Sequence, residues 1–229
     1  MRKCLDEARQ HSRAGDYAKA LELFEYFFDH ALDEDDGALY GVRLSFCLAY
    51  WAELAETYPP AEQRLLERKT ECLDAFLDSE DAELFHDFAA ICKYLDEPDA
   101  PLDKFEELLR DDKPKADIVV RYLWDDLIDA GRWNACKPYL ADPEAHYQRA
   151  LAQVDNMAEL YRTRPEDLGP RFEKRIKRTC VKKFGNLLKA LANIDRREES
   201  KALLCQLAKD LEERELDCVL NSVRERAAI

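Results

Sequence analysis

The sequence has few residues that interrupt helices and few that favour strands. Only six Gly and nine Pro occur among its 229 residues, and β-branched residues are sparse beside Ala, Leu, Glu, Lys and Arg. Because those abundant residues have high helix propensity, the composition favours helix over strand. Hydrophobic residues make up 47% of the chain, which is enough for a folded core and argues against disorder. We predict an all-α protein.

The sequence also lacks the motifs of common enzyme classes. It contains no Gly-rich phosphate loop, HExxH, GxSxG or dinucleotide fingerprint. Five Ser and four Thr leave few hydroxyl nucleophiles. None of the eight cysteines forms a CxxC pair, which argues against a zinc site. The sequence therefore predicts a protein that is not an enzyme and has no cofactor or metal.

Long apolar runs are missing too. The longest clearly apolar run, Leu44 to Ala52, is far too short to span a bilayer. The first residues, Met1 to Arg9, are charged where a signal peptide needs an apolar stretch. We therefore expect a cytoplasmic protein without membrane contact, with free and mostly buried thiols.

The charged residues are segregated along the chain. Residues 1–112 hold 29 Asp and Glu against 12 Lys and Arg, whereas residues 113–229 hold 20 against 23. An acidic surface speeds the encounter with basic molecules and disfavours nucleic acid. We expect a basic protein partner and no nucleic acid. We also expect one helical domain over residues 1–229, with a soft division near residue 112.

Prolines indicate where helices begin, because proline is tolerated in the first helical turn. The clearest start is Asp142-Pro143-Glu144, with a capping aspartate before the proline. Ser79-Glu80-Asp81 gives a similar signal without proline. The prolines that precede amphipathic segments are Pro60, Pro101, Pro114, Pro143 and Pro170.

Apolar residues recur at helical spacing between these starts. The pattern is clear in residues 17–31, 172–194 and 203–211. Residues 39–54 are apolar over most of the helix circumference, which predicts the core of the N-terminal half. Ile118-Val119-Val120 is the one strand-like fragment, but its flanks continue at helical spacing. We expect roughly ten to twelve helices joined by short loops.

One segment carries a family resemblance. The run Arg13-Ala14-Gly15-Asp16-Tyr17-Ala18-Lys19-Ala20-Leu21-Glu22-Leu23-Phe24 resembles the turn and second helix of a tetratricopeptide repeat, in which a small turn precedes an aromatic, an alanine and a large apolar residue. Partial echoes occur at residues 129–133 and 194–204. The resemblance implies antiparallel helical hairpins, stacked as a tetratricopeptide-like solenoid or an irregular helical bundle, and protein binding in a concave groove.

An acidic cluster is the candidate partner-binding site. It follows an aromatic-rich segment, so its carboxylates would receive Lys and Arg from a partner while aromatics supply apolar contact. The alternative is a solvated loop whose acids favour the start of the next helix. A calcium loop is disfavoured because the alternating ligands and distal Glu of an EF-hand are missing. The candidate residues are Asp29, Asp33, Glu34, Asp35, Asp36 and Tyr40.

Two further patterns carry weaker signals. Glu83 and His86 form a single Glu-x-x-His step, whereas a di-metal carboxylate bundle needs two. A basic stretch with one acid, Glu173, would touch phosphate, a subunit or the acidic half of the chain itself. The bases of this stretch are Arg171, Lys174, Arg175, Lys177, Arg178, Lys182 and Lys183.

The leading functional hypothesis is a non-enzymatic protein–protein interaction module that binds a basic protein through its acidic N-terminal half. Within this class, the acidic character favours a bacterial immunity protein that neutralises a cationic toxin. One alternative is a tetratricopeptide-like scaffold or regulator that recognises a short peptide in its groove. Another is an enzyme with an unrecognised carboxylate or metal site.

Overall fold

The computed structural model describes residues 1–33 and 38–228, and it contains helices and turns without a strand in those residues. The prediction of an all-α protein is therefore confirmed. The chain divides into two compact units, residues 1–123 and 124–229, which are described separately below. The first unit holds 30 Asp and Glu against 15 Lys and Arg, and the second holds 19 against 20. The acid excess thus belongs to the N-terminal unit.

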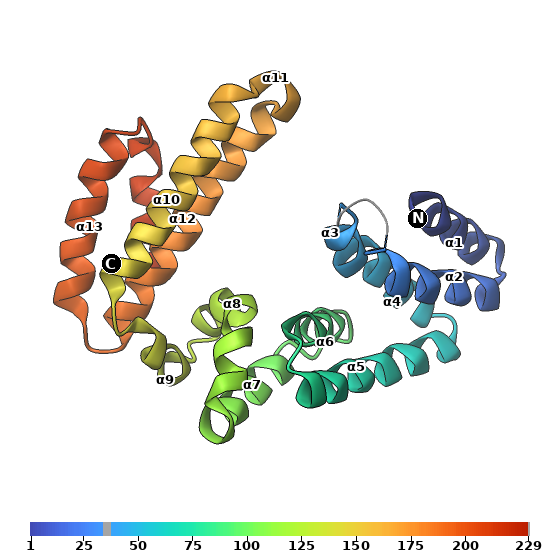
Figure 1. Ribbon diagram of the computed structural model, residues 1–229. Helices are drawn as coiled ribbons and strands as arrows, with labels where there is room; N and C mark the ends of the chain where they lie inside the picture. The colour runs from blue at the N-terminus through green and yellow to red at the C-terminus, as the bar shows by residue number, and fades with distance from the viewer. Residues whose placement is uncertain (34–37, 229) are drawn as a thin grey trace. The chain divides into compact units, whose positions relative to one another are not determined.

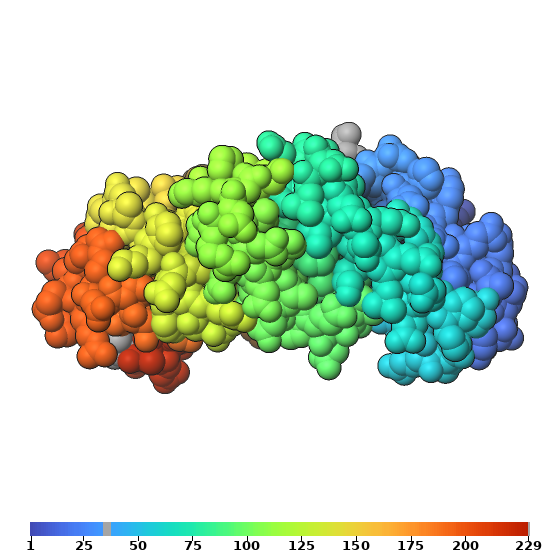
Figure 2. Space-filling view, turned by 90° about the horizontal axis from the view of Figure 1, so that it is seen from below, coloured from blue at the N-terminus to red at the C-terminus, as the bar shows by residue number. Residues whose placement is uncertain are grey.

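The N-terminal unit is built from helices that pack against their neighbours (Figure 1). Helices α1 and α2 form one hairpin, and α5 packs along α6. Residues in the range of α5, coloured cyan to teal, form part of the surface that Figure 2 shows. The helices are α1 (Arg2–Ala14), α2 (Tyr17–His30), α3 (Tyr40–Val42), a π-helical turn (Arg43–Cys47), α4 (Leu48–Ala55), α5 (Pro59–Ser79), α6 (Ala82–Tyr94), α7 (Ala100–Asp111) and the first part of α8 (Lys113–Asp129).

The predicted core of the N-terminal half is present. Helix α4 packs against α2, α5 and α6, and the side chains of Leu48, Trp51 and Leu54 are almost fully buried. Phe46 is an exception, because 57% of it is exposed. The indole Nε1 of Trp51 donates a hydrogen bond of 3.0 Å to the carbonyl of Ala61, which links α4 to the first turn of α5.

The C-terminal unit is organised around α12, which packs against α10, α13 and α14. Figure 1 shows α10 and α12 running beside each other, joined through α11. Tyr147 and Phe184 lie in the core between them, with ring centroids 5.2 Å apart. The helices are the end of α8, α9 (Trp133–Cys136), a 3₁₀ turn (Lys137–Leu140), α10 (Pro143–Thr163), α11 (Pro165–Leu168), α12 (Pro170–Asn193), α13 (Arg197–Glu212), a second 3₁₀ turn (Asp217–Val219) and α14 (Leu220–Ala227).

The expected helix starts are confirmed by their capping contacts. The Asp142 carboxylate accepts a hydrogen bond of 2.9 Å from the Ala145 N–H at the start of α10. Asp81 accepts one of 3.0 Å from the Glu83 N–H at the start of α6. The strand-like fragment 118–120 lies inside α8, as its helical flanks predict. Short helices such as α3, α9 and α11 were not anticipated, because three or four residues are too few to show a period.

The same turn recurs at the ends of five helices. A residue with positive φ is followed by an N–H that donates to the carbonyl five residues earlier, which is the Schellman motif. Gly15, Gly131 and Asp195 lie in the segments that resemble a tetratricopeptide repeat, with φ of 83°, 69° and 64°. In the remaining two of these five turns, the left-handed residues are Asp96 and Glu215. Recurrent hairpin turns of one geometry are compatible with a helical repeat fold.

Gly15 should be sensitive to substitution for a backbone reason alone. A Cβ at this position would meet nothing within 4 Å, but φ is 83°. We expect Gly15→Ala to lower the free energy of unfolding by about 1 kcal/mol, and Asp195→Gly to raise it by up to about 1 kcal/mol. Urea denaturation followed by circular dichroism measures both. A neutral Gly15→Ala variant would mean that the turn does not hold the left-handed conformation.

The cysteines are free thiols. Five are buried, namely Cys47, Cys72, Cys92, Cys136 and Cys180. Burial raises the pKa of the Cys72, Cys92 and Cys180 thiols to about 12. These three therefore stay protonated at neutral pH and are poor nucleophiles.

Candidate functional site

The predicted acidic site is only partly described. Glu34, Asp35 and Asp36 lie outside the described residues. Asp29 accepts a hydrogen bond of 2.9 Å from Arg68 Nη2 of α5, and the Asp33 carboxylate lies 2.8 Å from His30 Nδ1. Both carboxylates thus already have partners within the chain.

Tyr40, the sixth predicted residue, joins a polar cluster that includes the Glu-x-x-His step. Its hydroxyl donates to Glu83 and also lies 2.5 Å from His86 Nδ1. Because a phenol carries one proton, His86 must then donate from Nδ1 to the Tyr40 oxygen. The Tyr122 hydroxyl donates to the other Glu83 oxygen at 2.5 Å, and the Tyr122 ring stacks on His86 with centroids 4.2 Å apart. Residues of α3, α6 and α8 therefore meet at one place.

The electrostatics of this cluster favour a fixed protonation state. Burial lowers the pKa of His86. Burial also raises the pKa of the Glu83 carboxyl, but hydrogen bonds from Tyr122 and Tyr40 outweigh it and leave that pKa below its ordinary value. Burial and the Glu83 carboxylate raise the pKa of Tyr40. At neutral pH Glu83 is ionised, accepts hydrogen bonds from two tyrosines and has the Arg121 guanidinium 3.6 Å away, so the cluster holds three helices together.

No metal site accompanies this cluster. In residues 1–33 and 38–228, no group of three or more His, Cys, Asp or Glu side chains is arranged to hold a metal ion. The sequence contains no second Glu-x-x-His step besides the one formed by Glu83 and His86.

A buried ion pair lies one helical position away, between Arg43 of the π-helical turn and Asp87 of α6. Arg43 is 4% exposed and Asp87 is 6% exposed. Two guanidinium nitrogens donate to the two carboxylate oxygens, Nη1 to Oδ2 at 2.9 Å. Burial raises the pKa of Asp87, and the Arg43 charge opposes that shift. The guanidinium also lies over the Phe28 ring, 4.5 Å from its centroid.

An acid-lined hollow is the best candidate for contact with a basic partner. It has a volume of about 370 Å³ and lies between the end of α4, the start of α5 and the turn after α6. Glu56, Glu62 and Asp96 line it, and all three are exposed. No ion pair joins these carboxylates to another described residue. Leu65 and Tyr94 supply apolar lining.

The sequence pattern did not identify this hollow. Its three carboxylates stand apart in the sequence, and the Schellman turn places Asp96, with a φ of 58°, beside the other two. The available signal was the combination of two acids around the Pro59-Pro60 helix start with a third acid at a helix end. That combination has no fixed spacing, so it could be found only in three dimensions.

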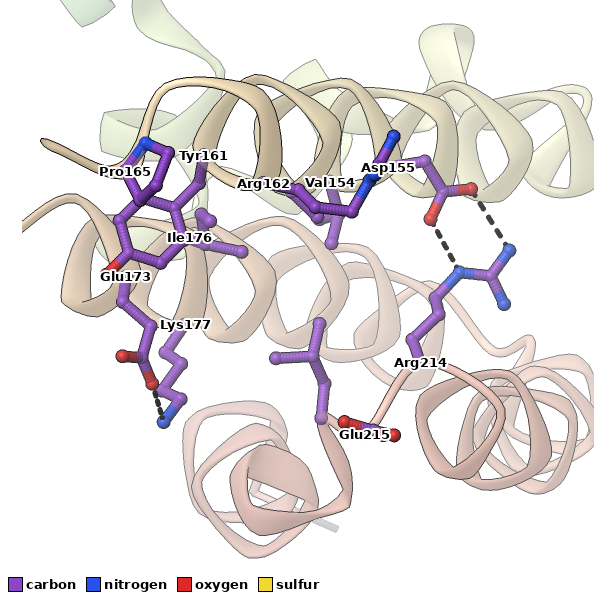
Figure 3. A pocket seen from close by; sticks show the side chains of 12 residues that line it. Val154, Asp155, Tyr161, Arg162, Pro165, Glu173, Ile176, Lys177, Arg214 and Glu215 are labelled. Carbon is purple, nitrogen blue, oxygen red and sulfur yellow. Dashed lines mark hydrogen bonds and ion pairs between the residues drawn. The ribbon is translucent and has the colours of Figure 1, made fainter. Parts of the chain in front are cut away.

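A second hollow lies within the C-terminal unit (Figure 3). It has a volume of about 560 Å³ and is lined by α10, α12 and the turn after α13. Arg214 donates two hydrogen bonds to Asp155 across it, at 2.6 and 3.0 Å. Val154 and Ile176 provide buried apolar surface.

Comparison with known proteins gives no assignment. No protein-family model matches the chain, and no curated protein or solved structure matches it. Across the part of the chain that the structure describes, no helix has both the length and the apolar character needed to cross a bilayer.

Proposed function

We propose that this protein is a non-enzymatic binding module whose N-terminal unit binds a basic protein. The observation that carries the proposal is the hollow lined by Glu56, Glu62 and Asp96. A carboxylate that has no cationic partner in its own chain is available to a partner's Lys or Arg. Asp29 and Asp33, in contrast, already have partners in the chain, so we propose the hollow as the contact in preference to these two carboxylates.

The shape of the hollow suits a long basic side chain. Lys and Arg have apolar stems that pack on apolar surface while the charged end stays at a polar rim. Tyr94 and Leu95, which are partly exposed, offer such surface, and the three exposed carboxylates offer the rim. The acid excess of the whole unit would add long-range attraction that speeds association.

Within this class we favour a tetratricopeptide-like immunity protein that neutralises a cationic bacterial toxin in the cytoplasm. The shared turn geometry at Gly15, Gly131 and Asp195 supports the repeat-like fold. The acid excess of the N-terminal unit supports a cationic target. Free thiols support a reducing compartment.

The test is a matched pair of triple variants of the full chain. One variant is Glu56→Gln/Glu62→Gln/Asp96→Asn, in the hollow. The control is Asp74→Asn/Asp78→Asn/Glu80→Gln, three exposed acids of the same unit outside the hollow. Each removes three negative charges, so only position differs. We expect the hollow variant to weaken binding of a fluorescent hexa-arginine peptide about tenfold more than the control.

Two further measurements decide the outcome: the salt dependence of peptide binding, and the binding of a purified cationic protein. Fluorescence anisotropy at low and at physiological salt separates local contact from diffuse attraction, because screening weakens interactions between distant exposed charges most. Equal losses in the two triple variants would overturn the hollow as the contact. No saturable binding of the peptide or of a purified cationic protein such as a ribonuclease would overturn the basic-partner function itself.

A further inference from the structure

One exposed side of helix α12 carries a row of cations. Its members occupy positions i, i+3, i+4 and i+7, so they share one face of the helix and span about 10 Å of its length. All four residues are exposed, and no described carboxylate forms an ion pair with any of them. We call this set the α12 basic row, and it consists of Arg171, Lys174, Arg175 and Arg178.

The acids of the same segment do not neutralise the row. Residues 164–182 hold seven Lys and Arg against three Asp and Glu. Glu173 and Asp167 pair with cations of this segment outside the row, at 2.7 and 2.9 Å. Glu166, the third acid, forms no ion pair with another described residue, and it can offset only one of the four charges. The row is therefore a positive surface on a chain of net charge −14.

The acid-lined hollow of the N-terminal unit has the opposite charge. Glu56, Glu62 and Asp96 line it, and its described lining includes no Lys or Arg. Among the described residues of one chain, neither surface is neutralised: the three carboxylates lack a cation, and the four cations lack a carboxylate. Both surfaces are thus open to a partner. A second copy of the chain presents the matching surface to each of them.

We propose that the α12 basic row of one copy of this protein binds the acid-lined hollow of a second copy. The inference rests on the proposed function in taking the hollow as a site for basic side chains. A helix face projects its long side chains outward, so their stems pack on Tyr94 and Leu95 of the hollow while their charged ends meet its carboxylates. A second copy is favoured over nucleic acid because it accounts for both unneutralised surfaces at once.

This contact is reversible and regulates access to the hollow. Exposed ion pairs each contribute little to association, so the copies separate readily. A basic partner that binds the hollow competes with the row of the second copy. The hexa-arginine peptide should therefore return associated chains to monomers.

Sedimentation velocity of the full chain over a concentration series tests the contact. At about 0.15 M salt the Debye length is about 8 Å, so repulsion between distant charges of two acidic chains is screened more than attraction between charges in contact. We expect the weight-average sedimentation coefficient to rise with protein concentration under this condition. It should stay at the monomer value in about 1 M salt, where the contact charges are screened as well.

Two triple variants each remove one surface. One is the hollow variant of the peptide experiment, and the other is Arg171→Gln/Lys174→Gln/Arg178→Gln, the row variant. We expect each to weaken self-association about tenfold or more. The hollow variant changes the net charge from −14 to −11, so diffuse repulsion alone would strengthen its association. Because the contact joins two different surfaces, an equimolar mixture of the variants keeps one intact pair and should form a 1:1 complex.

A matched control removes three positive charges elsewhere. Lys137→Gln/Arg149→Gln/Lys209→Gln changes exposed cations of the C-terminal unit outside the row. Its net charge equals that of the row variant, so only the position of the lost charges differs. It should leave self-association unchanged.

Three results would overturn the proposal: a wild-type chain that is monomeric at every concentration, a hollow or row variant that associates as tightly as the wild type, or a mixture without a 1:1 complex. It is also overturned if the row variant keeps self-association and instead loses binding to a DNA duplex. The hexa-arginine peptide separates this inference from the proposed function. If the peptide binds the hollow and the chain stays monomeric, only the inference fails. If both variants lose self-association and the peptide does not bind, only the proposed function fails.

Discussion

Asp87→Ala is expected to lower the free energy of unfolding by about 3–5 kcal/mol. The substitution leaves the Arg43 guanidinium charged in a place where that residue is 4% exposed. Arginine does not lose its proton at accessible pH, so the uncompensated charge must be solvated by local opening of the unit. Urea denaturation, followed by circular dichroism and by tryptophan fluorescence, to which the buried Trp51 contributes, measures the loss.

The ion pair itself is a weaker source of stability than this loss suggests. The free-energy cost of desolvating both charges offsets much of the free energy gained from their attraction. The double variant Arg43→Met/Asp87→Leu should therefore be more stable than Asp87→Ala alone. Glu159→Ala, which breaks the exposed pair with Arg162, is the matched control and should leave stability unchanged. A small loss in Asp87→Ala, equal to that control, would contradict burial of the pair.

Local signals in the sequence predicted much of the helical structure. Asp142 and Asp81 were recognised as helix starts because a cap acts on N–H groups only two or three residues away. Residues 39–54 were placed in the core because an apolar circumference requires burial on several sides. Each of these inferences uses contacts within one helix or its immediate flank.

Contacts between distant residues were not predictable in the same way. Arg43 and Asp87 were not singled out, although each stands among apolar residues, because nothing in the spacing pairs them. Glu83 and His86 were recognised as one helix face, but their contacts with Tyr40 and Tyr122 depend on how α3 and α8 pack on α6. The residues after Asp195 resemble those after a repeat turn, but Asp195 is not the glycine that usually marks a left-handed residue.

The candidate sites were likewise predictable in their overall charge but not in their contacts. Charge segregation located the acid excess in the N-terminal part, because net charge needs no fold to be counted. It did not distinguish Asp29, which Arg68 neutralises, from Glu62, which has no cationic partner among the described residues. That distinction depends on α5, which brings Arg68 to α2 and presents Glu62 to the hollow.

Gly185→Ala is expected to lower the free energy of unfolding by about 1–3 kcal/mol, although alanine is the better helix former. A Cβ at Gly185 of α12 would lie 2.9 Å from Cβ and 3.0 Å from Cγ of Arg226. These atoms are at the base of the Arg226 side chain, so they cannot move away without shifting α14. Arg226 is also held by hydrogen bonds to Asn186 at 2.7 Å and to Asp129 at 2.8 Å.

The sign of the change in the free energy of unfolding distinguishes this packing role of Gly185 from an effect of helix propensity. Gly41→Ala is the matched control, since Gly41 is also helical and its Cβ would meet nothing within 4 Å. That variant should gain up to about 1 kcal/mol, because alanine loses less backbone entropy than glycine. Urea denaturation gives both values, and limited proteolysis should release residues of α14 first in Gly185→Ala. If Gly185→Ala stabilised the chain as Gly41→Ala does, the close approach of α14 to α12 would be wrong. The predicted loss follows from the missing Cβ, which allows α14 to pack directly on the backbone of α12.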